Sequence, residues 1–248
     1  MKYSNQPQLH PRTVCRRLLA ADLPALDLLL RGHLPALAQP AFAELHSALV
    51  QGELWGWFCG EHLLCGGILL PLNAPCRLCV DAAALTGIPE LAPQRQSLLW
   101  APVIDRPQAE KLLPELICLC LERTSKHRRS EMLAAVPIKS AADLSAFFLA
   151  GFTLIGLRPL LRLCPCWLLL ASDKQTDYNK EHQLRLELSD TRLIGRRLEE
   201  GWRGVALDAE GRLLLVRSGE TNREDPGPQE EQNEAGDSGF VCTYRGRP

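Results

Sequence analysis

The sequence has no excess of charge of either sign and no long uninterrupted apolar run. Its 28 Lys and Arg residues against 29 Asp and Glu residues leave a net charge of −1, which gives no electrostatic reason to expect nucleic acid or an anionic membrane as a partner. The longest apolar stretch, residues 160–171, contains Arg162 and Pro165 and is shorter than the roughly 18–20 residues of a transmembrane helix. The first twelve residues lack the apolar core and cleavage site of a signal peptide. We therefore expect a cytoplasmic protein.

Several motifs that would identify a chemistry are also missing. The sequence contains no P-loop, dinucleotide-binding fingerprint, Gly-x-Ser-x-Gly motif or metal-binding box. Cys76 and Cys79 form a Cys-x-x-Cys pair, but a structural zinc site needs a second pair or two histidines, and Cys164 and Cys166 are the candidate partners. Most of the ten cysteines lie in apolar runs such as LICLCL. We interpret them as reduced, buried side chains and expect no metal.

The chain has enough apolar residues, 46%, for a globular core. Hydrophobic periodicity and the positions of Gly and Pro predict alternating strands and helices. The expected elements are a strand at 13–19, a helix from 22 that ends before Pro35, a helix at 41–49, a hairpin of 54–59 and 63–70, a strand at 97–101, a helix at 110–126, a strand at 132–136, a helix at 141–150 that ends at Gly151, and strands at 152–161 and 167–170.

The composition changes after this first unit, which we assign to residues 1–172. Residues 173–182 are polar and predict a linker, and residues 184–217 alternate as a compact β-rich pattern. Residues 219–238 are acidic and rich in Pro and Gly, which predicts a disordered insertion before a closing strand at 240–244. The second unit therefore spans residues 183–248.

Three segments of the first unit resemble the GNAT superfamily of N-acyltransferases. RRLLAADLPALDLLL is similar to the family's opening strand and first helix, WGWFCGEHLLCGGILL to its central hairpin, and SAADLSAFFLAGFTLIG to the segment near its end. The resemblance covers residues 12–171. It implies an α/β (α+β) fold with a mixed central sheet flanked by helices.

The resemblance also implies where acyl-CoA would bind. In the family, strands 4 and 5 splay apart and the acyl-CoA arm enters between them, so Leu99, Trp100 and Ala101 would supply backbone contacts. A loop of the form Arg-Gly-x-Gly follows strand 4 and holds the pyrophosphate with backbone amides at a helix N-terminus. Here that loop reads DRPQAEKLL: the glycines are missing, and Arg106 and Gln108 are the candidate phosphate ligands.

Two positions bear on catalysis. Many GNAT enzymes place a Tyr that protonates the leaving thiolate five residues before the Phe of Gly-Phe, and this sequence has Phe147 there. Glu53, at the start of the hairpin, is a candidate general base or a solvated strand end. The resemblance implies an acyl-CoA-dependent N-acyltransferase that takes acetyl-CoA or another acyl-CoA and an unidentified amine acceptor. The alternative is a catalytically decayed scaffold that acts as a binding or regulatory protein.

The second unit resembles the small SH3-like barrel at the C-terminus of biotin–protein ligases. The similarity rests on Gly204, Asp208, Gly211 and residues 213–215, which together suggest a Gly-containing hairpin between apolar strands. No ligase catalytic motif precedes it. The resemblance implies a β-barrel-like domain that docks a protein or nucleotide partner.

Overall fold

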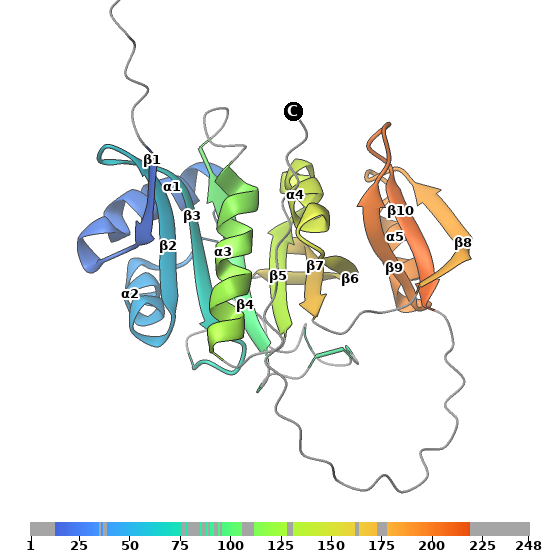
Figure 1. Cartoon of the computed structure of the whole chain (residues 1–248), viewed down its shortest axis with the longest axis horizontal. Coiled ribbons are helices and arrows are strands. Elements are labelled where there is room, and N and C mark those ends of the chain that lie inside the picture. The colour runs from blue at the N-terminus through green and yellow to red at the C-terminus, as the bar shows by residue number, and fades with distance from the viewer. Residues whose placement is uncertain are drawn as a thin grey trace, which may run out of the picture.

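A computed structural model describes residues 13–34, 36, 39–75, 78, 85, 88, 90–91, 94, 96–105, 112–127, 131–161, 164–172 and 178–218. Within these residues the strands join into one mixed sheet of order β1-β2-β3-β4-β5-β7-β6-β9-β10-β8 (Figure 1). The strands are β1 (Thr13–Arg17), β2 (Glu53–Cys59), β3 (His62–Pro71), β4 (Gln96–Ile104), β5 (Glu131–Pro137), β6 (Thr153–Leu161), β7 (Cys164–Ser172), β8 (Tyr178–Leu186), β9 (Trp202–Leu207) and β10 (Leu213–Ser218).

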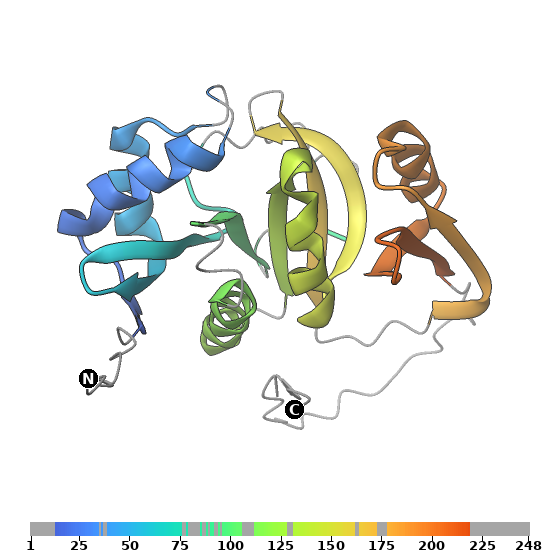
Figure 2. The same cartoon turned by 90° about the horizontal axis from the view of Figure 1, so that it is seen from above.

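Helices cover both faces of the part of the sheet that runs from β1 to β6. The helices are α1 (Leu23–His33), α2 (Phe42–Gln51), α3 (Leu112–Lys126), α4 (Leu144–Leu149) and α5 (Thr191–Glu199), with 3-10 turns η1 (Ala20–Asp22) and η4 (Ile138–Asp143). Helices α1 and α2 lie on one face, and α3 and α4 lie on the other (Figure 2). Each face has its own hydrophobic core, because alternate residues of each strand point to opposite sides of the sheet.

The turns follow the residues that the sequence places there. Gly60 has a φ of +61° in the turn between β2 and β3, and Gly151 has a φ of +86° just after α4. Glycine populates this left-handed region without the steric penalty of a Cβ atom, so both positions end their elements where the sequence predicts. The mixed α/β fold predicted from the sequence is confirmed.

The unit after β7 differs from its prediction in one element. The sequence pattern predicts β structure throughout residues 184–217, but residues 191–199 form helix α5. Ile194 and Leu198 are the buried residues of this helix, and they are spaced by four, which is the helical repeat and not the two-residue repeat of a strand. The prediction of a strand here was therefore wrong.

The described part of this unit is an open three-stranded antiparallel sheet, in which β10 pairs with both β9 and β8. The predicted SH3-like barrel is not confirmed, since these strands continue the main sheet through β9 and β6. Strand β8 begins at Tyr178, so part of the predicted linker at 173–182 is a strand. The predicted insertion at 219–238 and the predicted strand at 240–244 lie outside the described residues.

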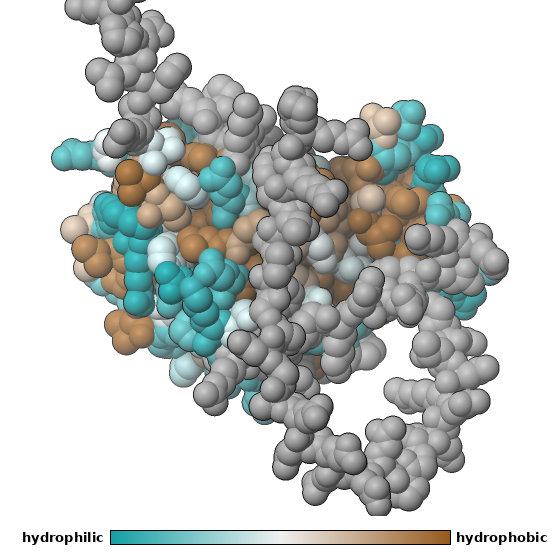
Figure 3. Space-filling view, viewed as in Figure 1, coloured by the Kyte–Doolittle hydropathy of each residue, from teal (hydrophilic) through white to brown (hydrophobic). Residues whose placement is uncertain are grey.

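Figure 3 shows hydrophobic side chains at the surface of the unit after β7, over β9 and β10. In the described part of the chain, every helix is too short or too polar to span a bilayer.

Candidate functional site

The two parallel strands of the sheet separate partway along their length. Strand β4 pairs with β5 from Gln96, opposite Glu131, to Trp100, opposite Ala135. Beyond this last pair β4 continues to Ile104 and β5 ends at Pro137, without further pairing between them in the described residues. The strands therefore diverge beyond this pair, and we call the place where they part the β4–β5 wedge.

A β-bulge in β4 lies directly at the start of the wedge. Trp100 is opposite Ile68 of β3, whereas Val103 is opposite Gly66, so β4 has one more residue than β3 in this interval. The extra residue reverses the alternation of side chains, and Trp100 and Val103 both enter the core under α1 and α2. A bulge bends its strand and increases the local twist, which explains why β4 turns away from β5 here. Pro102 suits this position because it has no N–H to donate to the ladder.

Two buried tryptophans flank the wedge from opposite faces of the sheet. Trp100 packs in the core under α1 and α2, and Trp167 of β7 lies opposite Val136 of β5 and packs in the core under α3 and α4. Both side chains are fully buried, and neither Nε1 atom has a hydrogen-bond partner among the described residues. Trp57 of β2 has an unpartnered Nε1 as well. Unpaired buried donors of this kind are uncommon in folded proteins.

The predicted contact residues of strand 4 lie at this point in the fold. Leu99 and Trp100 form the last two residue pairs with β5, and Ala101 follows them at the bulge. Arg106 and Gln108, the predicted phosphate ligands, lie outside the described residues. The structure thus brings the predicted strand residues to the wedge.

Asp105, the first residue of the altered loop, is held against β3. Its backbone N–H donates to the Leu64 carbonyl at 2.7 Å, and its Oδ2 lies 3.0 Å from Nε2 of His62. Strand β3 is on the side of β4 away from β5. The carboxylate is therefore engaged on the far side of β4 from the wedge.

Glu53 lies at the start of β2, under the C-terminal end of α3. Trp55 Nε1 donates to Oε2 of Glu53 at 2.9 Å, and Nε2 of His127 lies 3.2 Å from Oε1. The Glu53 side chain is 17% exposed, so it is not a solvated strand end. It is opposite Leu69, which is opposite Leu99, so two strand spacings of about 4.8 Å separate it from β4.

The surroundings of Glu53 favour its charged form. Burial alone would raise the pKa of the carboxyl, but hydrogen bonds from Trp55 and His127 and the positive charges of His127 and Arg123 hold the pKa below its ordinary value of 4.5. The Arg123 guanidinium in turn stacks on the Trp55 ring, 4.6 Å from the centroid. The cluster ties α3 to β2, and the role of Glu53 as a general base stays a prediction.

Phe147 occupies the position where a catalytic Tyr is common in GNAT enzymes. It is fully buried and packs edge to face against Phe152, with ring centroids 5.2 Å apart. Its ring has no proton to donate, so its role in this structure is core packing.

No group of three or more His, Cys, Asp or Glu side chains is arranged to hold a metal ion in the part of the chain that the structure describes. The described cysteines are free thiols. Burial raises the pKa of the Cys65 and Cys120 thiols, so both are protonated and unreactive at neutral pH. Cys76 and Cys79 lie outside the described residues.

Comparisons with known proteins identify the fold. No protein-family model matches the chain. No curated protein matches it in sequence. A probable acetyltransferase from Staphylococcus epidermidis has a similar structure, with a TM-score of 0.50 and 14% sequence identity over 66% of this chain and 100% of that chain.

Two further solved structures align less closely. A putative acetyltransferase from Salmonella typhimurium, solved with its cofactor acetyl-CoA, has a TM-score of 0.49 and 10% identity over 68% of this chain and 99% of that one. The ribosomal-protein-S18-alanine N-acetyltransferase from Escherichia coli has a TM-score of 0.47 and 13% identity over 68% and 98% of the two chains. At such identities the similarity shows the fold alone, and that fold is the GNAT fold.

Proposed function

We propose that the chain is an acyl-CoA-dependent N-acyltransferase that holds the acyl arm in the β4–β5 wedge. The observation that carries the proposal is the end of pairing at Trp100 and Ala135 while both strands continue. Past this pair, the backbone groups of β4 that face β5 have no ladder partner among the described residues. A substrate arm that contains amide groups satisfies such an edge by pairing with it as an added strand does.

The residues of β4 would position the acyl group. Leu99, Trp100 and Ala101 supply the strand edge, and an amide of this edge would polarise the thioester carbonyl, as oxyanion donors do in acyl transfer. The thioester supplies an activated acyl carbon. An amine that attacks this carbon forms the C–N bond as the C–S bond breaks, and the amine loses a proton.

Protonation of the leaving group must come from a source other than position 147. Phe147 has no ionisable hydrogen, and its ring lies inside the core. A free thiol has a pKa of about 8.5, so a thiolate takes a proton from water readily at neutral pH. The proposed enzyme would therefore rely on positioning and on carbonyl polarisation, with water as the acid.

The second candidate is a binding or regulatory protein on the same scaffold, which docks a partner through the unit after β7. Phe147 and the absence of glycines at 105–108 favour it, because both remove groups that assist catalysis or phosphate binding. This candidate predicts weak or absent binding of CoA and no transfer to any amine. On either account we propose a cytoplasmic protein.

Calorimetric titration with acetyl-CoA and with CoA separates the two candidates. Val136 packs in the core under α3 and α4 just beyond the last pair, so Val136→Trp should overpack this core, shift β5 at the wedge and weaken binding at least tenfold. Val50→Trp is the matched control, because Val50 is 85% exposed on α2. If folded wild-type protein binds neither ligand at millimolar concentration, the wedge is closed to acyl-CoA and the acyltransferase proposal fails.

A further inference from the structure

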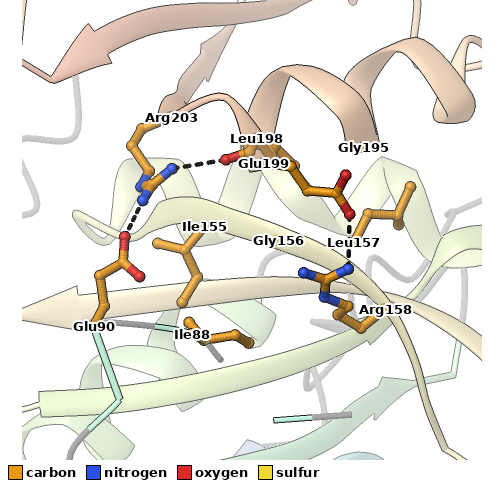
Figure 4. Close-up of a pocket in the computed structure, with 11 residues that line it drawn as sticks. Ile88, Glu90, Ile155, Gly156, Leu157, Arg158, Gly195, Leu198, Glu199 and Arg203 are labelled. Carbon is orange, nitrogen blue, oxygen red and sulfur yellow. Dashed lines mark hydrogen bonds and ion pairs between the residues drawn. The ribbon is translucent and has the colours of Figure 1, made fainter. Parts of the chain in front are cut away.

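A second opening in the sheet lies between β6 and β9. In the described residues these strands pair only at Leu154, opposite Gly204, and they separate beyond that point. The space between them is a cavity of about 390 Å³, walled by β6, α5, the start of β9 and residues 88 and 90 (Figure 4). This volume is in the range of small-molecule sites.

Two glycines line this cavity at positions where close packing does not require a glycine. Among the described residues, a Cβ atom at Gly195 of α5 would contact Leu157, at 3.8 Å. One at Gly156 of β6 would have three atoms of Leu168 as its nearest neighbours, the closest at 3.5 Å. Both are ordinary contact distances. Glycine inside a helix is less favourable than alanine, so Gly195 is not explained by the stability of α5. Both glycines line the cavity, and side chains there would reduce its volume.

An ion pair closes one end of the cavity. Arg203 pairs with Glu90, and its Nη1 also donates to the carbonyls of Leu198 at 3.1 Å and Trp202 at 2.7 Å. The Arg203 side chain is only 16% exposed. Because the Arg203 guanidinium already bonds to Glu90 and to two carbonyls, we assign it a structural role in the cavity wall and not a role in ligand binding.

The pair at the other end is suited to recognition. Arg158 Nη1 donates to Oε1 of Glu199 at 2.8 Å, and their side chains are 36% and 60% exposed. Arg158 lines the cavity and its side chain is partly exposed, so a ligand in the cavity can reach it. Figure 4 shows the two pairs at opposite ends, with Ile155 and Ile88 between them.

We propose that this cavity binds a free α-amino acid with an aliphatic side chain. The carboxylate and ammonium groups of an α-amino acid are on neighbouring atoms, so both can contact one Arg–Glu pair: the carboxylate accepts from Arg158, and the ammonium donates to Glu199. The aliphatic side chain then lies along Ile155 and Leu198.

The site is separate from the β4–β5 wedge. Gly156 is opposite Leu168 of β7, which is opposite Ala135 of β5, so two strand spacings, about 10 Å, separate the cavity from the wedge. Its walls come from both the main sheet and the unit after β7. Binding would therefore hold the two parts together, and it does not depend on acyl-CoA.

Calorimetric titration of the full chain with L-leucine tests the proposal. We expect saturable one-to-one binding, with L-leucinamide and 4-methylpentanoate at least tenfold weaker because each lacks one of the two charges. Arg158→Gln should weaken L-leucine binding at least tenfold, and Gly195→Met should abolish it by filling the cavity. Arg31→Gln is the matched control, since Arg31 forms a similar exposed ion pair with Asp27 on α1.

Three results would overturn the proposal. The first is no heat of L-leucine binding to the wild type at concentrations up to about 10 mM. The second is binding to Arg158→Gln with wild-type affinity. The third is equal affinity for L-leucine and L-leucinamide. Thermal unfolding of each variant without ligand verifies that a loss of binding is not a loss of folded protein.

Discussion

Gly204 of β9 lies opposite Leu154 of β6, in the one residue pair that joins the two strands within the described residues. A Cβ atom at position 204 would come within 2.9 Å of the Leu154 Cβ atom and 3.0 Å of Leu213 Cδ1, which is closer than packed carbon atoms tolerate. Leu154 and Leu213 are both fully buried and have little room to move. The hydrogen side chain of Gly204 therefore allows the unit after β7 to pack against the sheet.

Gly204→Ala should destabilise the protein by forcing these two leucines apart. Overpacking of a core typically costs about 1–3 kcal/mol, and we expect a loss in this range from urea unfolding. Gly32→Ala on α1 is the control, because a Cβ atom there meets nothing within 4 Å and alanine favours a helix. An unchanged urea midpoint for Gly204→Ala would mean that β9 does not pack on β6 as described.

Asp22 should make the stability of the N-terminal region depend on acid pH. Both of its carboxylate oxygens accept from Arg16 at 2.7 Å, and Oδ2 also accepts the Leu19 N–H at 2.8 Å. The hydrogen bonds from Arg16 come first among the causes that hold the pKa of Asp22 below its ordinary value of 3.8. A lowered folded-state pKa stabilises the fold above pH 3.8, and this contribution disappears as the pH falls through the folded-state value.

We therefore expect Asp22→Asn to lose about 1 kcal/mol of unfolding free energy at pH 7, less than a buried charged hydrogen bond contributes, because the Arg16 side chain is 42% exposed and solvent screens the pair. The difference from the wild type should shrink as the pH falls below 3.8. Urea unfolding at a series of pH values measures it. A difference that stays constant from pH 7 to pH 2 would show that the charge of Asp22 contributes nothing.

Glu53 should anchor α3 to β2. Glu53→Gln removes the charge that His127 and Arg123 face and weakens the bond from Trp55, so we expect a loss of about 1 kcal/mol in urea unfolding. The matched control is Glu122→Gln, because Glu122 forms an exposed ion pair with Lys126 on the same helix, and such pairs contribute little. Unchanged stability together with lost acyl transfer would instead support Glu53 as the general base.

The sequence predicts most of the elements of the fold because its hydrophobic periods are clear. The helix and strand spacings of residues 13–172 give the main elements that the structure contains, and Gly60 and Gly151 mark ends correctly. The predicted helix at 141–150 is shorter in the structure, where η4 occupies residues up to Asp143 and α4 begins at Leu144. Residues 191–199 were misread because Leu193, Ile194 and Leu198 lie among short polar runs that look like alternation. The sign of the helix is the four-residue spacing of Ile194 and Leu198, which places both side chains on one buried face.

The candidate site was predicted in part. The strand pattern and the resemblance locate Leu99 and Trp100. The point where β4 stops pairing with β5 depends on the register between the two strands, and the sequence of a single strand does not reveal that register. Trp167 was missed as a wedge residue because its place opposite Val136 follows from the insertion of β7 between β5 and β6. The cavity at Gly156 and Gly195 joins segments far apart in the chain, and no local pattern marks it.

Restoring glycine to the loop after β4 should raise the affinity for CoA. Pro107 has no backbone N–H, whereas a phosphate site at a helix N-terminus depends on backbone donors that approach closely. Pro107→Gly combined with Gln108→Gly returns a donor and frees the chain, while Asp105 keeps its contact with His62 and Arg106 keeps its charge. A hydrogen bond to a charged group is worth about 1.5–3 kcal/mol, so we expect roughly tenfold tighter binding by calorimetry after the entropic cost of the glycines. Pro107→Ala restores the donor without the added freedom and should give a smaller gain, and Arg106→Ala should weaken binding about tenfold or more. If all three variants bind CoA as the wild type does, the pyrophosphate is held by residues other than this loop.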